Sequence, residues 1–153
     1  MQQAKNSIAP AAPSRWPVVD FVDAINGGTR DEGASGIGLE EDGRLVAGVK
    51  YDNWNGASVC MHVAAEPGAK WMTRGYLFAC FDYPFNQLKA RKVLGPVAAS
   101  NAQARRFDEH LGFKVEATIA DAAPDGDLLI YSMTRDHCRF LGMKHGQQSS
   151  TRA

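Results

Sequence analysis

The stretch NAQARRFDEHLGF, residues 101–113, predicts an amphipathic helix whose two ends are both marked in the sequence. Asn101 is a favourable N-cap because its side-chain oxygen accepts a hydrogen bond from a backbone N–H of the first turn. Gly112 is a favourable C-terminal stop because glycine adopts the left-handed conformation at low cost. At about 100° per residue, one apolar sector contains Ala104, Phe107 and Leu111. We expect this sector to face the core.

A second stripe of the same helix is polar, and core packing does not require it. Asn101, Arg105 and Asp108 lie within about 60° of one another on the helix surface. An aspartate has an ordinary pKa of about 3.9, so we expect Asp108 to be ionised at pH 7 and to be held so by Arg105, one turn earlier. The stripe is therefore the first candidate for a functional surface.

The segments around this helix predict a mixed α/β sheet. Asp42-Gly43 between two strand-like runs is a hairpin signal, and alternating apolar residues predict a third strand. Pro84 is expected to loosen the helix that contains it. The expected elements are a helix at 18–25, strands at 37–40, 45–51 and 57–66, a helix within 69–88, a strand at 91–100, the helix from Asn101, strands at 114–121 and 127–135, and a short helix at 136–143.

Length, charge and cysteine usage favour one reduced, soluble domain. The chain has 153 residues and zero formal net charge, 17 Lys plus Arg against 17 Asp plus Glu, which argues against a protein that mainly neutralises nucleic-acid phosphates. Residues 1–17 are expected to be a flexible arm rather than a signal peptide or membrane anchor, residues 18–142 the domain, and residues 143–153 a disordered tail. Three irregularly spaced cysteines favour free thiols and a cytoplasmic location.

The opening stretch resembles a segment of the GNAT superfamily of acetyl-CoA-dependent N-acyltransferases. The family pattern Asn-x-x-Ala-x-x-apolar-x-x-x-Leu-Gly-Phe is matched by Asn101, Ala104, Phe107, Leu111, Gly112 and Phe113. By the order of elements the resemblance covers residues 37–133, and it is nearest the branch that acetylates protein N-termini and the similar small acetyltransferases of phages. It implies a single-domain GNAT-like α/β fold with an abbreviated N-terminal helical segment. The mixed central sheet would be splayed at the acetyl-CoA site, between the strand at 57–66 and KVLGPV at 92–97.

The resemblance also implies a pyrophosphate-binding loop, where the sequence departs from the family. The family pattern Arg/Gln-x-x-Gly-x-Gly/Ala falls on GAKWMT, in which Gly68, Trp71 and Thr73 replace all three defining residues. Backbone N–H groups at a helix start favour phosphate, Lys70 and Arg74 add positive charge, and Trp71 would have to point away from the cofactor. The expected cofactor-binding residues are Met61, His62, Val63, Gly68, Ala69, Lys70, Trp71, Met72, Thr73, Arg74, Asn101 and Arg105.

Two of these residues have a structural interpretation as well. Asn101 can be a helix cap, and this role is compatible with the place beside the pantetheine arm that the resemblance implies. Arg105 can be a solvated surface residue, the usual situation of an arginine, or a phosphate contact. The sequence leaves these alternatives open.

His62 is the candidate catalytic residue. It can be an interior histidine, or the general base that takes a proton from the amine, because imidazole titrates near neutral pH. The alternative bases are Asp52, Glu66 and Glu109. His62 and Cys60 together supply too few ligands for a structural zinc, so no metal is expected.

The activity implied by the resemblance is transfer of an acetyl group from acetyl-CoA to a primary amine, with a peptide or protein N-terminus as the acceptor that an open site would suit. A backbone N–H of the Met61 to Val63 strand would polarise the thioester carbonyl. Many family members protonate the departing thiolate with a tyrosine seven residues after the helix asparagine. Asp108 occupies that position here, and as an ionised group it is not expected to be the acid.

Two other functional classes fit the altered loop. One is a non-catalytic acyl-CoA-binding module, and the other is a phage-type interaction protein that uses the same fold as a scaffold. For the acetyltransferase and for both alternatives, we expect a monomer or homodimer that binds neither nucleic acid nor membrane.

Overall fold

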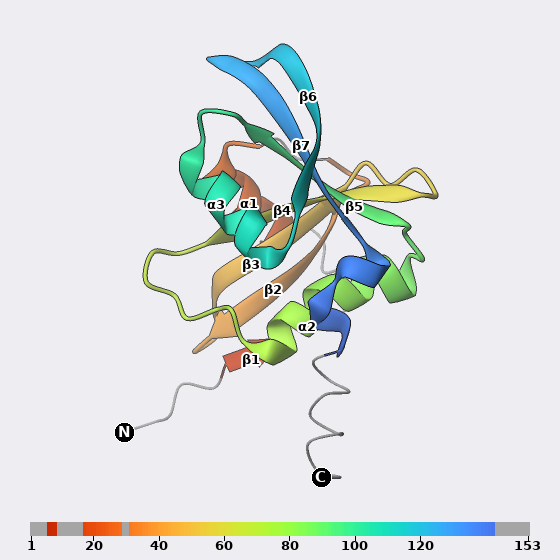
Figure 1. Ribbon diagram of the computed structural model, residues 1–153. Helices are drawn as coiled ribbons and strands as arrows, with labels where there is room; N and C mark the ends of the chain where they lie inside the picture. The colour runs from red at the N-terminus through yellow and green to blue at the C-terminus, as the bar shows by residue number, and fades with distance from the viewer. Residues whose placement is uncertain (1–5, 9–16, 29–30, 143–153) are drawn as a thin grey trace.

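The computed structural model describes residues 6–8, 17–28 and 31–142 (Figure 1). These residues form one mixed sheet with the strand order β1-β2-β3-β4-β5-β7-β6. The strands are β1 (Asn6–Ile8), β2 (Ser35–Glu41), β3 (Arg44–Asp52), β4 (Ser58–Ala65), β5 (Lys92–Ala98), β6 (Lys114–Ala123) and β7 (Gly126–Thr134), and the α-helices are α1 (Pro17–Asn26), α2 (Arg74–Asp82) and α3 (Ala102–Leu111). In the ranges described, no helix is long and apolar enough to span a bilayer.

The first hairpin forms as its turn residues predict. Asp42 and Gly43, between β2 and β3, both have positive φ, at 53° and 78°. Positive φ at both central residues is the turn geometry that Asp-Gly favours, because it matches the twist of the two strands. Ala47 and Val49 on β3 are almost fully buried. The predicted pairing of β2 with β3 is confirmed.

Helix α3 begins and ends at the residues that the sequence marks. Asn101 Oδ1 accepts a hydrogen bond from the backbone N–H of Ala104 at 3.1 Å. Gly112 follows the helix in the left-handed conformation, with φ 106°. In the predicted apolar sector, Leu111 is buried, whereas Ala104 and Phe107 are half-buried against the core. Local capping chemistry therefore marks both ends of this helix.

Helix α2 changes geometry near Pro84, as expected. The α-helix ends at Asp82 and continues as a π-helical turn over Tyr83–Gln87. Proline has no backbone N–H, so the α-helical hydrogen-bond ladder cannot run through it unchanged. At the other end, the Thr73 hydroxyl accepts a hydrogen bond from the backbone N–H of Tyr76 at 3.3 Å. The segment after β4 therefore leads into a capped helix N-terminus.

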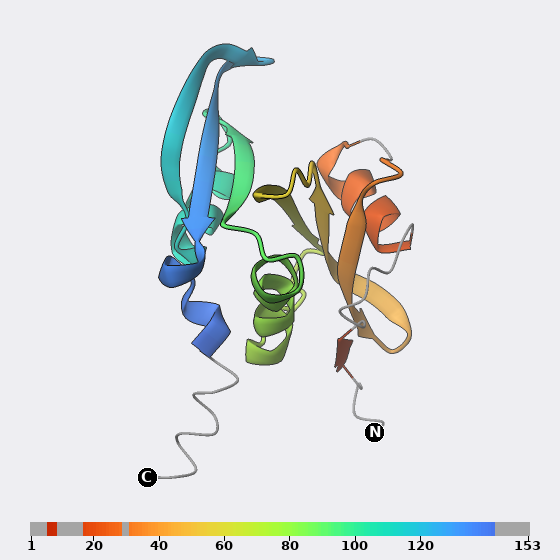
Figure 2. The same cartoon turned by 90° about the vertical axis from the view of Figure 1, so that its right-hand side faces the viewer.

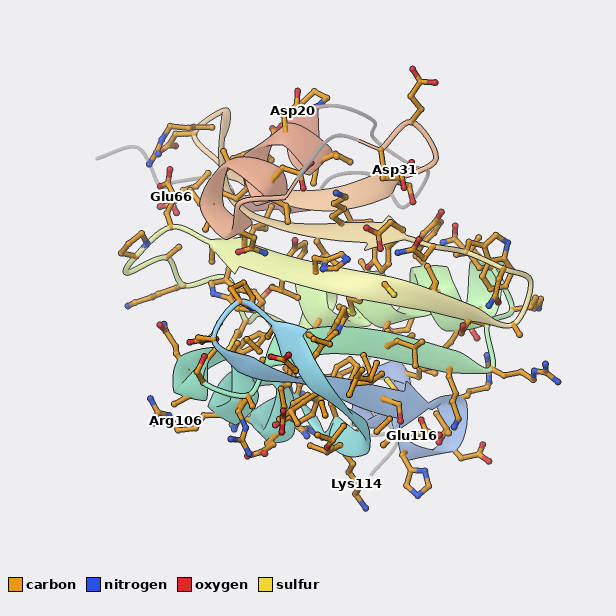
Figure 3. All side chains as sticks on the ribbon, turned by 90° about the horizontal axis from the view of Figure 1, so that it is seen from above. Asp20, Asp31, Glu66, Arg106, Lys114 and Glu116 are labelled. Carbon is orange, nitrogen blue, oxygen red and sulfur yellow. The ribbon has the colours of Figure 1, made fainter. Side chains whose placement is uncertain are left out.

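Helices α2 and α3 cover one face of the sheet, and α1 covers the other (Figures 1 and 2). Both α2 and α3 belong to crossovers between parallel strands that advance in the same direction across the sheet, so the right-handed rule places them on one face. Viewed from above, Asp20 of α1 and Arg106 of α3 lie on opposite sides, with the strands between them (Figure 3).

Helix α1 lies close to the sheet because glycines of β2 and β3 form the surface that it packs against. A Cβ atom on Gly36 would come within 2.8 Å of Val18 Cγ1, and one on Gly48 would come within 3.1 Å of both Val18 and Val22. Val18 and Val22 are almost fully buried there. The predicted helix at 18–25 is confirmed, and its position is fixed by a close approach that only residues without a side chain permit.

The two ends of the fold differ from the sequence-based expectation. Residues 6–8, expected within a flexible arm at 1–17, form β1 and pair with the exposed edge of β2. Three residues are too few for an alternating pattern to predict a strand. The short helix expected at 136–143 is instead two 3-10 turns, Arg135–His137 and Arg139–Gly142. The rest of the arm and the tail at 143–153 lie outside the described residues.

Candidate active site

The sheet opens between β4 and β5. These parallel strands pair only where Ser58–Cys60 meets Lys92–Leu94. Strand β4 nevertheless continues to Ala65, and β5 continues to Ala98. The two halves of the sheet diverge beyond the paired residues (Figure 2). The expected splay is confirmed, and the backbone groups that line it have no partner strand within the described part of the chain.

Val63 on β4 directs its backbone into this opening. Its carbonyl oxygen accepts a hydrogen bond from Asn26 Nδ2 of α1 at 3.1 Å. The Glu66 N–H donates to the Val46 carbonyl, and bonded pairs alternate along an antiparallel ladder, so Val63 opposite Val49 is not bonded to β3. In an antiparallel ladder the N–H and C=O of one residue point to the same side, so the Val63 N–H also faces away from β3. His62 is the register partner of Lys50 and alternates with Val63. Within the segment expected to polarise the thioester, Val63 is therefore the residue whose N–H is directed into the opening, since Met61 follows the last residue paired with β5.

The loop at residues 68–73 lies at the open end of the sheet. Gly68 has φ 80°, which glycine adopts at low cost. The side chains of Lys70 and Arg74 are exposed. The loop ends at the N-terminus of the nine-residue helix α2, whose unpaired N–H groups and dipole favour an anion. Glu66, just before the loop, lies at the same end of the molecule as Arg106 of α3 (Figure 3).

The indole of Trp71 packs inward. Its ring centroid lies 5.4 Å from that of Phe107 on α3 and 6.3 Å from that of Tyr76 on α2. These two helices share one face of the sheet and flank the opening. The half-buried ring of Trp71 therefore fills space between the two helices, and its orientation relative to a bound cofactor stays a prediction.

On the other face of the sheet, four ionisable side chains form a connected row. His62 Nε2 lies 2.9 Å from Asp52 Oδ1, Lys50 Nζ lies 3.9 Å from Asp52 Oδ2, and Lys50 Nζ lies 2.8 Å from Asp23 Oδ1. We call Asp23, Lys50, Asp52 and His62 the charged row. The side chain of Lys50 is 6% exposed and that of His62 is 29% exposed. The charged row therefore runs from the interior toward solvent, with His62 at its outer end.

Asp108 faces the opening from α3. A Cβ atom on Gly95 would lie 3.3 Å from Asp108 Oδ2, and Gly95 is the first residue of β5 beyond its pairing with β4. Glycine at this position leaves room for the carboxyl group over the split. Desolvation by burial, followed by the Glu109 carboxylate, raises the pKa of Asp108 to about 7, and His62 acts in the opposite direction. Asp108 and His62 are therefore close enough to influence each other electrostatically.

The prediction that Arg105 holds Asp108 ionised was wrong. Arg105 Nε donates a hydrogen bond to the Tyr131 hydroxyl at 3.3 Å, and Arg105 Nη1 donates to the carbonyl oxygen of Ala99 at 3.1 Å. The guanidinium is therefore directed to β7 and to the end of β5. Among the described residues, the Asp108 carboxyl has no ion-pair partner. Asp108 was excluded as an acid because an ion pair with Arg105 would keep it ionised, and that ion pair is not formed.

Most of the other candidate residues are engaged in contacts within the protein. Asn101 is the helix cap, and its contact with pantetheine stays a prediction. Of the alternative bases, Glu66 pairs with Arg44 at 2.5 Å on the surface, and Glu109 accepts a hydrogen bond from the Tyr131 hydroxyl at 2.9 Å. Asp52 is engaged with His62. The described residues contain no group of three or more His, Cys, Asp or Glu side chains arranged for a metal ion.

Sequence reasoning missed Lys50, Asp23 and Gly95. Lys50 is separated from Asp23 by 27 positions, and their contact depends on how α1 docks. A lysine between Val49 and Tyr51 reads as the solvent-facing position of an alternating strand. The sequence feature that indicates a covered face is the pair Gly36 and Gly48, against which α1 packs. These two glycines are recognised as one surface only after β2 and β3 have been paired.

A cavity of about 280 Å³ borders the charged row at Asp52. Its lining includes Ser35, Tyr51, Asp52, Trp54 and Tyr83, from β2, β3, the loop after β3 and the π-helical turn. Neither the loop at 68–73 nor α3 contributes to it, so it is not the expected cofactor groove.

No protein-family model matches the sequence, and no curated protein does. Solved structures do match the fold. Mutant forms of the spermidine/spermine N-acetyltransferase SpeG from Vibrio cholerae are 17% identical, with a TM-score of 0.61 over 93% of this chain and 98% of that chain. The SpeG complex with CoA and spermine is 19% identical, with a TM-score of 0.58 over 78% and 76% of the two chains. The Campylobacter jejuni N-acetyltransferase PseH with acetyl coenzyme A is 16% identical, with a TM-score of 0.52 over 76% and 77%. The fold inferred from residues 101–113 is therefore confirmed: this chain has the fold of the GNAT N-acetyltransferases.

Proposed function

We propose that this protein is an acetyl-CoA-dependent N-acetyltransferase that acts on a primary amine. The observation that carries the proposal is the opening between β4 and β5, with His62 on one side of the sheet and Asp108 on the other. One side supplies a group that can accept a proton and the other a group that can donate one. The similar structures support acetyl transfer, since SpeG is crystallised with CoA and spermine and PseH with acetyl coenzyme A.

The residues along the opening fit acetyl-CoA. The N-terminus of α2 and the loop at 68–73 would hold the pyrophosphate, with Lys70 and Arg74 adding positive charge. The missing side chain at Gly95 leaves space beside the split, and the Val63 N–H is directed so that it can donate to a carbonyl oxygen there. Acetyl-CoA supplies the thioester carbonyl and a thiolate leaving group.

Two side chains would manage the protons of the reaction. His62 takes one proton from the attacking nitrogen as the nitrogen–carbon bond forms, and Asp52 holds the imidazole in place. Asp108 gives its proton to the sulfur as the carbon–sulfur bond breaks. The products are an N-acetyl amine and a thiol, with His62 protonated and Asp108 ionised, and exchange with solvent restores both groups. This assignment replaces the expectation that Asp108 takes no part in the chemistry.

The acceptor class is tested directly with the full chain. Acetyl-CoA would be incubated with the protein and a panel of free-amine peptides, polyamines and single-amine compounds, and the products read by intact mass. We expect a gain of one acetyl group on at least one primary amine, with a peptide N-terminus as the acceptor expected from the sequence. In parallel, acetyl-CoA at 100 times its dissociation constant should raise the unfolding free energy by about 2.7 kcal/mol.

The two readouts separate the rival functions. Stabilisation without acetylation of any acceptor would identify a non-catalytic acyl-CoA-binding module. Absence of both would identify an interaction protein that uses the fold as a scaffold. Either outcome would contradict the proposed function.

The loop assignment predicts a specific loss. Replacing Lys70 and Arg74 together with alanine should weaken acetyl-CoA binding and flatten its dependence on salt, because two exposed cations near the phosphates are removed. The matched control is Arg91→Ala with Lys114→Ala, two exposed cations at the other end of the sheet. Titration calorimetry at several salt concentrations makes the comparison. Equal affinity of wild type and the loop variant at low salt would show that the phosphates bind elsewhere.

A further inference from the structure

Lys50 is a lysine in the interior of the protein. The residue is 4% exposed and lies in the middle of β3, on the face that α1 covers. Lysines are almost never this buried without a partner, because removing an ammonium from water is costly. Lys50 Nζ lies 2.8 Å from Asp23 Oδ1 of α1 and 3.9 Å from Asp52 Oδ2, two positions along its own strand. One buried cation therefore faces two carboxylates.

The second of these carboxylates connects Lys50 to the proposed site. The other oxygen of Asp52 lies 2.9 Å from His62 Nε2, and Lys50 and His62 are register partners across β3 and β4. The ammonium thus lies near Asp52 Oδ2 as an ion-pair partner, while Asp52 Oδ1 binds the imidazole and also accepts a hydrogen bond from Asn53 Nδ2 at 3.3 Å. The charge of Lys50 and these two hydrogen bonds together orient the carboxylate.

The inner end of the charged row is fixed as well. The side chain of Asp23 is 12% exposed, and its Oδ2 is buried without a hydrogen-bond partner among the described residues. Helix α1 packs closely on the sheet, because Val18 leaves no room for a Cβ atom at Gly36 and would be in tight contact with one at Gly48. Asp23 is therefore presented to Lys50 by a closely packed helix.

Docking of α1 alone does not account for this arrangement. An apolar side chain in place of Lys50 would bury the same area without desolvating charges, and replacement of buried ion pairs by apolar residues is often neutral or stabilising. A docking pair would also need only Asp23, whereas the same ammonium approaches the carboxylate that binds His62.

We propose that Lys50 and Asp23 are positioning residues for the reaction, and that through Asp52 they orient His62 so that Nδ1 is the atom that accepts the proton of the acceptor amine. The inference rests on the proposed function for its consequence, but not for its geometry. A carboxylate can only accept hydrogen bonds, so the neutral imidazole beside Asp52 must carry its proton on Nε2. The remaining nitrogen, Nδ1, is then the free base.

The positive charge of Lys50 has a second effect. It partly balances the negative charge of Asp52, the carboxylate that also binds His62, so its removal leaves that carboxylate with one positive neighbour fewer. The groups that face His62 are Lys50 and Asp52 from β3 and Asp108 from α3, and Cys60 on β4 is the register partner of Asp52. Loss of Lys50 changes one of these groups and leaves the others in place.

The test compares three substitutions in the charged row. Lys50→Met removes the charge, Lys50→Arg keeps it, and Asp23→Asn weakens the inner pair. We expect Lys50→Met to lower kcat about tenfold or more, with an unchanged KM for acetyl-CoA and the acid limb of kcat/KM moved to higher pH. Lys50→Arg should retain most of the rate. The matched control is Lys92→Met, which removes an exposed lysine paired with Glu116.

The test can still be made if the Lys50→Met variant does not fold. If Lys50→Met fails to fold, Asp23→Asn and the double variant Asp23→Asn/Lys50→Met replace it, because the double variant removes opposite charges together. An unchanged kcat and pH profile in the folded variants would overturn the positioning role. So would an equal loss in Lys92→Met, since the effect would then be unspecific.

The atom assignment has a readout that needs no turnover. Long-range proton–nitrogen NMR spectra of the imidazoles report which ring nitrogen carries the proton, and His62→Gln identifies the His62 signal among the four histidines. We expect the Nε2–H tautomer in wild type above neutral pH and a mixture in Lys50→Met. A wild-type Nδ1–H tautomer, or a spectrum unaffected by Lys50→Met, would overturn the inference. If instead the tautomer is as expected but no amine is acetylated, the proposed function fails and the geometry stands.

Discussion

Replacing Asp108 by asparagine is expected to lower kcat by about a hundredfold or more, the range typical of losing a general acid. The amide has nearly the same shape as the carboxyl group, so it fits over Gly95 without a new clash, but it cannot give a proton to the departing sulfur. The affinity for acetyl-CoA should change little. Steady-state kinetics with a competent acceptor, together with titration calorimetry for acetyl-CoA, measure both quantities. Asp125→Asn in the exposed β6–β7 turn is the matched control.

The pH dependence makes this prediction sharper. Burial raises the pKa of Asp108 to about 7, so the carboxyl group can donate a proton below that pH and loses it above. The rate of the wild type should therefore fall on the alkaline side as Asp108 ionises. Asp108→Asn should lack this alkaline limb. An equal rate for wild type and Asp108→Asn at every pH would show that Asp108 is not the acid and that sulfur leaves without it.

The pH dependence of the unfolding free energy tests the protonation of Asp108 independently of catalysis. The folded-state pKa of Asp108 lies above its ordinary value, so the folded state binds the proton more tightly than the unfolded chain does. Its contribution to the unfolding free energy is complete below about pH 4 and is lost as pH rises through about 7, on the order of 2–4 kcal/mol for the shift of Asp108. Urea melts across this window should show a smaller decline for Asp108→Asn than for wild type.

The parts of the fold that the sequence predicts are those determined by neighbours in the chain. The cap at Asn101, the stop at Gly112 and the turn at Asp42-Gly43 each depend on a few adjacent residues, and all three form as expected. The change of helix geometry at Pro84 follows from one missing N–H. Such features survive whatever the tertiary structure adds.

The partner of Arg105 and the pKa of Asp108 were predicted wrongly because both depend on residues that are distant in the sequence. Helix spacing places Arg105 next to Asp108, but it cannot show that Tyr131 of β7 and the carbonyl of Ala99 bind the guanidinium first. Helix spacing also cannot show that the Asp108 carboxyl is partly buried beside Gly95 of β5. The pKa of Asp108 is set by that burial, so a sequence argument starting from its ordinary value reached the opposite conclusion.

Replacing His62 by glutamine is expected to lower kcat/KM by about a hundredfold or more, with acetyl-CoA affinity retained. Glutamine can still donate a hydrogen bond to Asp52, but it cannot accept a proton from the amine near neutral pH. Asp52→Asn should cost less, because the imidazole remains and only its orientation is disturbed. The measurement is kcat/KM for the acceptor as a function of pH, with His110→Gln on the exposed face of α3 as the control.

The two catalytic variants should remove opposite limbs of the pH profile. In the wild type the rate falls on the acid side when His62 is protonated and on the alkaline side when Asp108 is ionised, so His62→Gln should lose the acid limb and keep the alkaline one, whereas Asp108→Asn should do the reverse. A structural defect at either position would lower the rate at all pH values and leave the shape unchanged. A profile in which both variants keep both limbs would therefore assign the protons to other groups, even if both variants are slow. Because His62 and Asp108 come from opposite faces of the sheet, the double variant should retain whatever rate the opening itself provides through positioning of the amine and the Val63 N–H.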